Sequence, residues 1–164
     1  MKMNAFKIPA LCFSALTICF VFAACSKNNI VLEEQKVYSN AFWHYDSLAN
    51  FTFKPENDDK YALYLTLRNS DSYESCNMHL VYTLTEQKDT LSTERKELIL
   101  TDCNTGQPLG KSVGTFFDYE FPLKENIDLK AGKNYLVSFK QFMRQDTLKG
   151  VHAVGFQLRK MPND

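Results

Sequence analysis

The sequence lacks an excess of charge of either sign, because its 164 residues contain 19 basic and 19 acidic side chains. A nucleic-acid-binding domain usually shows a basic patch or stripe, so this balance argues against a nucleic-acid partner. Internal repeats and low-complexity segments are also missing. The length therefore suits one domain with a sizeable core.

Sequence signatures of catalysis are missing as well. There is no Gly-rich phosphate loop, no Cys-x-x-Cys pair and no Gly-x-Ser-x-Gly nucleophile elbow. The histidines His44, His79 and His152 are far apart in the sequence, whereas a metal site needs several converging ligands. We interpret His79 and His152 as solvent-facing strand residues, and we expect no catalytic, cofactor-binding or metal-binding residues.

Two pairs of carboxylates could supply acid–base chemistry, namely Asp58 with Asp59 and Asp118 with Glu120. Acidic side chains are mostly exposed in folded proteins, so solvated turn and strand positions explain these pairs more simply. The sequence therefore predicts a protein that is not an enzyme.

Helical periodicity is missing too, because no window keeps apolar residues at i, i+3, i+4 and i+7 next to a cap. Residues 61–68 and 78–85 instead alternate with a period of two, which gives each run one apolar face. A nine-residue connection joins the two runs, and we expect a strand pair that seeds the core. A lone hairpin is marginal in water, so the rest of the chain must cover these faces.

Other alternating runs are separated by turns rich in glycine, proline, asparagine and aspartate. The runs cover residues 37–45, 48–53, 91–100, 116–121, 135–140 and 151–159. Charges within residues 91–100 indicate an edge strand, and Pro122 is expected to end the run before it. The fold class predicted is all-β, an antiparallel, jelly-roll-like β-sandwich of about seven to nine strands.

The first 24 residues have the composition of a signal peptide. Lys2 and Lys7 precede an apolar run that ends in Phe22-Ala23-Ala24-Cys25. Small residues before a cysteine resemble the lipobox of bacterial lipoproteins, which implies cleavage before Cys25 and lipidation of its thiol. The alternative is an ordinary secretory peptide cut after Ala24, which would leave Cys25 as a free thiol.

The residues after Cys25 bear on sorting. Ser26 is not the aspartate that commonly retains lipoproteins in the inner membrane, and no acidic cluster of the surface-export kind follows directly. By this resemblance the protein is lipid-anchored in the cell envelope, in the outer membrane and facing the periplasm. We expect a signal peptide at 1–24, a lipidated tether at 25–36 and a β-sandwich domain at 37–160.

Cys76 and Cys103 are the two cysteines that remain beyond Cys25, and both fall in expected loops. Outside the cytoplasm such a pair could form a disulfide. The alternative is two thiols that lie too far apart to bridge, since the Cα atoms must approach within about 7 Å.

Aromatic residues gather at Trp43 and at residues 116–121. Outward rings there could stack on sugar rings, whereas inward rings would supply buried area to the core. The sequence favours core packing at both places.

Several short segments, taken together and in order, resemble the GldH family of gliding-motility lipoproteins. The matching pieces are Phe42-Trp43-His44 with Asp46-Ser47, residues 61–69 with Tyr73 and Asn77, Asp89-Thr90-Leu91, residues 141–144, residues 148–151, and Val154-Gly155. They span roughly residues 37–160. One departure is Pro108 before Leu109-Gly110, where the family tends to carry an aromatic residue.

The resemblance implies a Bacteroidetes envelope lipoprotein associated with gliding and the linked type IX secretion machinery. It carries over no catalytic residues. Our main hypothesis is a non-enzymatic protein, held to the membrane by its lipid, that supports this machinery through contacts with envelope proteins. The alternative is a glycan-binding β-sandwich lipoprotein, and we expect neither a small-molecule ligand nor a cofactor.

Overall fold

The computed structural model describes residues 29–162, which form eleven strands. No helix in this range could cross a membrane. The strands are β1 (Ile30–Val37), β2 (Phe42–His44), β3 (Ala49–Phe53), β4 (Asp59–Ser70), β5 (Asn77–Glu86), β6 (Asp89–Ile99), β7 (Lys111–Val113), β8 (Phe116–Leu129), β9 (Tyr135–Gln141), β10 (Thr147–Lys149) and β11 (Val151–Lys160). The predicted all-β class is confirmed.

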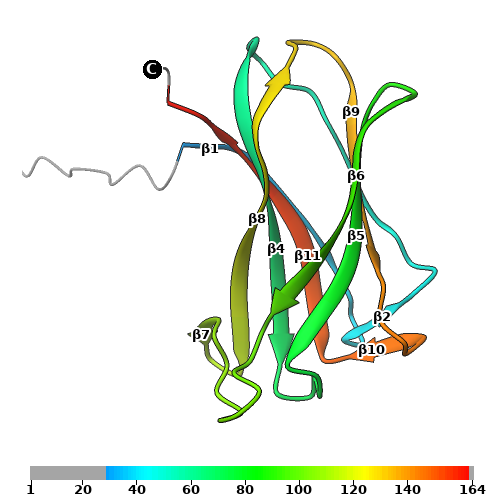
Figure 1. The fold of residues 1–164 in the computed structure, drawn as a ribbon, viewed down its shortest axis with the longest axis vertical. Coiled ribbons are helices and arrows are strands. Elements are labelled where there is room, and N and C mark those ends of the chain that lie inside the picture. Colours follow the sequence, from blue (N-terminus) through cyan, green and yellow to red (C-terminus); the bar gives the residue numbers. More distant parts are fainter. Residues whose placement is uncertain (1–28, 163–164) are drawn as a thin grey trace, which may run out of the picture.

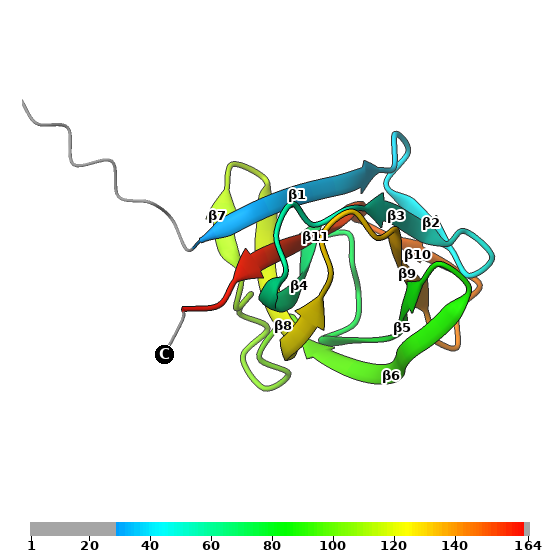
Figure 2. The same ribbon diagram turned by 90° about the horizontal axis from the view of Figure 1, so that it is seen from above.

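Two antiparallel sheets face each other (Figures 1 and 2). One has the strand order β1-β11-β4-β8-β7 and the other has the order β3-β9-β5-β6. A small sheet of β10 and β2 lies at the lower end in Figure 1. The expected edge strand at residues 91–100 is confirmed, since β6 is the last strand of its sheet.

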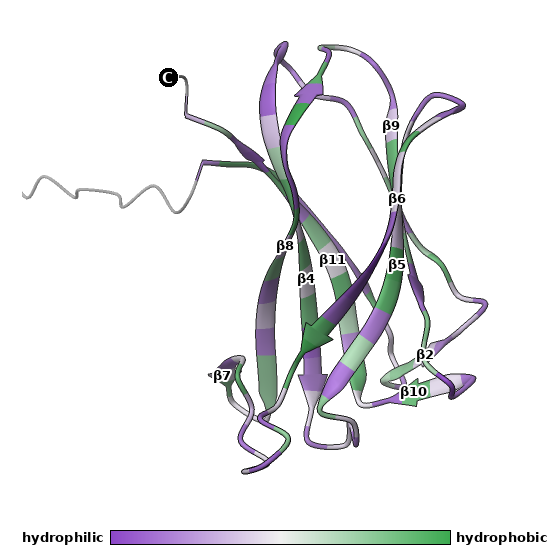
Figure 3. Cartoon of the chain, viewed as in Figure 1, coloured by the Kyte–Doolittle hydropathy of each residue, from purple (hydrophilic) through white to green (hydrophobic). Residues whose placement is uncertain are grey.

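The core lies between the two larger sheets. Figure 3 shows hydrophobic and hydrophilic residues alternating along β5 and β8, as a strand with one buried face requires. Phe51 and Phe53 of β3 each place their ring centroid 5.3 Å from that of Phe156 on β11. These rings join the two sheets and supply large buried area.

The expected pairing of residues 61–68 with residues 78–85 is wrong. These runs are β4 and β5, which belong to opposite sheets. β4 pairs with β11 and β8, whereas β5 pairs with β6 and β9. The apolar faces were assigned correctly, because alternation fixes which side chains are buried, but it does not identify the neighbouring strand.

The expected tether at residues 25–36 is too long, because β1 already begins at Ile30 and pairs with β11. Most side chains of β1 are exposed, so the strand shows little apolar alternation and resembles a linker in sequence. Gly155 of β11 permits the close approach, since a Cβ atom there would clash with the carbonyl oxygen of Glu34. The folded domain therefore starts at residue 30 and not at residue 37.

Pro122 does not end the strand at residues 116–121, because β8 continues to Leu129. The proline lies opposite Tyr64 of β4, next to a register shift. β7 pairs with β8 only as far as Asp118, so beyond that residue β8 is an edge on its other side. Proline is tolerated at an edge because no ladder hydrogen bond is lost there.

Candidate binding site at the end of the sandwich

Two connections meet at the lower end of the sandwich, the β4–β5 loop (residues 71–76) and the β6–β7 loop (residues 100–110) (Figure 1). A disulfide joins Cys76 of the first loop to Cys103 of the second, with Cα atoms 5.4 Å apart. The backbone N–H groups of Leu100 and Thr101 also donate to the carbonyl oxygen of Cys76, over 2.8 and 3.0 Å. The two loops are therefore fixed to one another.

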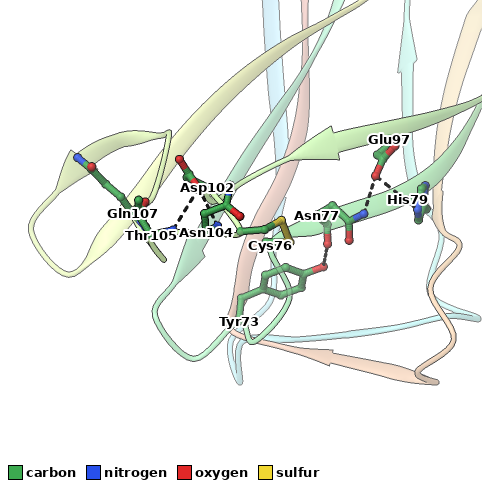
Figure 4. Close-up of a disulfide and its surroundings, with 10 residues drawn as sticks. Tyr73, Cys76, Asn77, His79, Glu97, Asp102, Asn104, Thr105 and Gln107 are labelled. Carbon is green, nitrogen blue, oxygen red and sulfur yellow. Dashed lines mark hydrogen bonds and ion pairs between the residues drawn. A yellow bond between two sulfur atoms is a disulfide. The ribbon is translucent and has the colours of Figure 1, made fainter.

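Each loop also has internal hydrogen bonds, several of which are drawn in Figure 4. Asp102 Oδ1 accepts from the backbone N–H groups of Asn104 and Thr105, at 2.8 and 3.2 Å. The hydroxyl of Tyr73 donates to the carbonyl oxygen of Asn77 over 2.8 Å, and burial raises the pKa of this phenol. These hydrogen bonds hold the two loops in place without a ligand.

A cleft of about 660 Å³ opens between these loops and β8. Its volume falls in the range of about 300–1,000 Å³ that is usual for ligand pockets. Three acidic side chains are among its lining residues, and no lysine or arginine is. The lining comprises Asn69, Ser70, Asp71, Tyr73, Glu74, Ser75, Cys76, Thr101, Asp102, Cys103, Gly106, Pro108, Phe117 and Tyr119.

Asn69 of β4 forms part of the cleft lining and faces the interior in line with Leu65 and Leu67. It is only 3% exposed, and its Oδ1 atom has no hydrogen-bond partner within the described part of the chain. Beside it, the Tyr119 hydroxyl donates to the carbonyl oxygen of Leu100 over 2.9 Å. Burial raises the pKa of the Tyr119 phenol.

The aromatic residues of β8 point mainly into the molecule. Tyr119 is buried, and Phe117 and Phe121 are partly buried against the core. Trp43 is fully buried, and its Nε1 donates to the carbonyl oxygen of Ser47 over 2.7 Å. Core packing, which the sequence favoured, holds for Trp43, Phe117, Tyr119 and Phe121, although Phe117 and Tyr119 also line the cleft. Phe116 is the exception, since its ring lies against His152 and Arg68.

Each acid of the two carboxylate pairs forms an ion pair with a base. The pairs are Asp58 with Lys130, Asp59 with Lys160, Asp118 with Arg68, and Glu120 with Arg159. The backbone N–H of Ala131 lowers the pKa of Asp58, and Lys160 lowers the pKa of Asp59. These carboxylates join neighbouring elements.

The three histidines remain apart. His44 is exposed and His79 is partly exposed, but His152 is half-buried with its Nε2 3.2 Å from the hydroxyl of Ser70. Sequence reasoning missed this contact, since the residues are 82 positions apart and a register shift near Val151 redirects His152. Within residues 29–162 no carboxylate bonds to His152, and no cluster there could hold a metal ion.

Exposed apolar side chains gather in residues 37–48, the apolar segment. Val37 is 65% exposed, and Phe42, Tyr45 and Leu48 are each at least 40% exposed. Phe42 also lines a second hollow of about 460 Å³, which shares Ser70 and Asp71 with the cleft. Phe42 of the apolar segment therefore lies next to the cleft.

Cys25, the expected lipidation site, lies outside the described residues, as does the signal peptide.

Comparisons with known proteins identify one family. The model of the GldH lipoprotein family matches residues 30–158, so the match begins where β1 begins. No curated protein matches the chain.

Solved structures give more distant similarities. A carbohydrate-binding module specific for non-crystalline cellulose, CBM28, is 9% identical with a TM-score of 0.44, and the match covers 80% of this chain and 74% of the module. The TNF protein Eiger from S. frugiperda is 14% identical with a TM-score of 0.30, and that match covers 66% of this chain and 63% of Eiger.

Proposed function

Because the chain belongs to the GldH lipoprotein family, we propose that it is a non-enzymatic envelope protein that supports the machinery of gliding and type IX secretion through protein contacts. Its lipid would be carried by Cys25, and its domain would hang from the outer membrane into the periplasm. The observation that carries this proposal is the family match over residues 30–158.

The apolar segment supplies a surface for such contacts. Exposed apolar surface often marks protein interfaces, and four exposed apolar side chains within twelve residues make this segment the candidate. β1 leads from Ile30 towards the lower end, and its eight residues span about 26 Å at about 3.3 Å per residue. A lipid before residue 30 would thus leave this end free to meet partners away from the membrane.

The glycan-binding alternative would need an outward row of aromatic rings beside a groove. Trp43 is fully buried, and of the two rings that line the cleft Phe117 is partly buried and Tyr119 is buried, so these three do not form an exposed row. Protein contact is therefore the better-supported mode of action.

A gene deletion tests the proposal in a strain that does not glide as well as in one that does. The deletion should lower the abundance or assembly of envelope complexes, measured by native separation and quantitative mass spectrometry. Wild-type protein should restore them, and Phe42→Ser should restore them less well. Leu91→Ser is the matched control, because Leu91 is 44% exposed, close to the 43% of Phe42, but lies on β6.

Unchanged envelope complexes in the deletion strain would contradict the proposal. So would saturable, micromolar binding of a glycan that is lost in Phe117→Ala without unfolding, because that result would assign the protein to the carbohydrate binders.

A further inference from the structure

We propose that the free edge of β3 binds an extended segment of a partner protein, which adds to the β3-β9-β5-β6 sheet as an antiparallel strand. This inference rests on the proposed contact function and names the conformation and chemistry of the partner. Its evidence is the set of free backbone groups on β3, the lack of edge protection there, and the exposed apolar residues that precede the strand.

The backbone groups of Asn50 and Thr52 point away from the sheet. β3 is the last strand of its sheet, and in the described part of the chain it pairs only with β9. The backbone N–H of Phe142 donates to the carbonyl oxygen of His79, so the even-numbered residues of β9 bond to β5 and the odd-numbered ones to β3. The N–H and C=O groups of Asn50 therefore face outward, as do those of Thr52, about 6.8 Å further along the strand.

One end of this outward row is already capped. β1 lies on the same side of the sandwich as β3 (Figure 2), and Lys36 Nζ donates to the carbonyl oxygen of Leu48 over 2.8 Å. Lys36 Nζ also donates to the hydroxyl of Ser47 over 3.0 Å. The free stretch therefore begins at Asn50, where an extended backbone is the group whose alternating donors and acceptors match the row.

The other long edges of the two sheets carry devices that prevent pairing. Glu94 and Lys96 of β6 lie on the inner face of that edge strand, and Glu34 and Lys36 of β1 do the same on theirs. The free edge of β8 contains Pro122 and register shifts. Inward charges, proline and bulges discourage the addition of a strand. β3 has no charge, no proline and no register shift, so its edge is the one suited to pairing.

The surroundings of β3 define the chemistry of the partner. Asn50 and Thr52 are exposed on the outer face, where cross-strand neighbours that are polar or β-branched pair best. Tyr45 and Leu48 precede the strand and are 40% and 43% exposed. An antiparallel partner that passes Ala49 continues towards Leu48, so apolar residues should follow its paired stretch and cover these side chains.

A second copy of the chain fits this edge less well than a different protein does. A two-fold pair centred on Phe51 would set Asn50 opposite Thr52 and Leu48 opposite Lys54 of the second copy. Lys54 is exposed and charged, so Leu48 would remain without an apolar neighbour. A different segment can match both ends of the edge, and we therefore assign the edge to an envelope partner.

The test places the photocrosslinking residue p-benzoylphenylalanine at position 50 of the full lipoprotein in cells. Mass spectrometry of the crosslinked peptides should locate them in one segment of about five residues in one partner, the usual length of a strand. Thr52→Pro should reduce this crosslink about fivefold or more, because it removes one outward N–H from the edge.

The matched control lies on the edge of β1. The backbone N–H of Tyr38 donates to the carbonyl oxygen of His152, so the odd-numbered residues of β1 face away from β11. Gln35→Pro thus also removes an outward N–H from an edge strand, but it should leave the crosslink from position 50 unchanged. Both proline variants should keep melting temperatures close to that of the wild type, because neither loses a hydrogen bond within its sheet.

A peptide scan tests the pairing without altering the protein. The crosslinked segment is synthesised as a peptide, and its binding to the full mature lipoprotein in detergent is measured. N-methylation of each amide that faces β3 should weaken binding about fivefold or more, whereas N-methylation of the intervening amides should leave it unchanged. This alternation decides the matter even if Thr52→Pro fails to fold.

The inference is overturned if position 50 gives no crosslink, if it crosslinks a second copy of the chain, or if p-benzoylphenylalanine at position 33 of β1 gives the same crosslink. An N-methylation scan without alternation also overturns it. The deletion experiment separates the two proposals, because lost envelope complexes together with an unreactive β3 edge would overturn only this inference. Unchanged complexes would overturn the contact function.

Discussion

Leu65 and Thr66 are neighbours on β4 with opposite environments. Leu65 is fully buried between the sheets, whereas Thr66 faces outward and is partly exposed. Leu65→Asp should prevent folding, because burial of an unpaired charge costs several kcal/mol, about the whole stability of a domain. Thr66→Asp should be far milder. Thermal unfolding of both variants checks this, and comparable melting temperatures would show that the register of β4 is wrong.

Residue burial could be predicted from the sequence where alternation is strong, as at Leu65 and Tyr82. Asn69 shows the limit. It continues the inward row of Leu65 and Leu67, so a polar residue on an apolar face was a visible signal. The environment of Asn69 depends on the loops that surround it, and the positions of those loops are known only from the fold.

The strands, too, could be predicted only in part. The turns and the apolar faces of β4 and β5 follow from sequence, but the sheet that each strand joins does not, since many pairings satisfy the same pattern. β1 was not predicted as a strand because it has no alternating apolar face. Its place in the sheet comes from backbone pairing with β11. The contact of Ser70 with His152 depends on a register shift that the local sequence pattern does not predict.

The disulfide should contribute measurably to the stability of the loops. Cys76 and Cys103 are 27 positions apart, and closing a loop of that length stabilises a fold by about 3.5 kcal/mol in the chain-entropy model. Cys103→Ser should therefore lower the free energy of unfolding by about this amount, measured by urea denaturation. The double variant Cys76→Ser/Cys103→Ser should lose the same free energy of unfolding. A wild type whose free energy of unfolding does not change when reductant is added would contradict the prediction.

Glu86 joins the end of β5 to β9. It accepts from Lys133 Nζ at 2.8 Å and from the Tyr135 hydroxyl at 3.0 Å, and these contacts lower the pKa of its carboxyl below the ordinary value of 4.5. The unfolded state then binds more protons than the folded state in this range, so stability rises with pH. The contribution is present above the ordinary pKa of 4.5 and is lost as pH falls through the lowered value.

Glu86→Gln should consequently flatten the decline in stability on acidification from about pH 5 to pH 3. Urea denaturation at a series of pH values measures this slope. Glu125→Gln serves as the control and should follow the wild type. A Glu86→Gln variant with the wild-type slope would show that these contacts contribute nothing to the pH dependence.

The proposed lipid on Cys25 would decide where the whole molecule works. We predict that Cys25→Ser abolishes lipidation, because the motif Phe22-Ala23-Ala24-Cys25 follows an apolar run. Metabolic labelling with a clickable palmitate should mark the wild type only. Cys103→Ser is the control and should still be labelled, and equal labelling of Cys25→Ser would contradict lipidation at Cys25.

We propose that this protein of the GldH family acts through contacts with other envelope proteins. The most direct measurement is co-purification from gently solubilised envelopes, with wild type, Phe42→Ser and the matched Leu91→Ser expressed at equal levels. Wild type and Leu91→Ser should recover the same defined set of envelope proteins, and Phe42→Ser should recover less. Recovery of no defined partner by the wild type would contradict it.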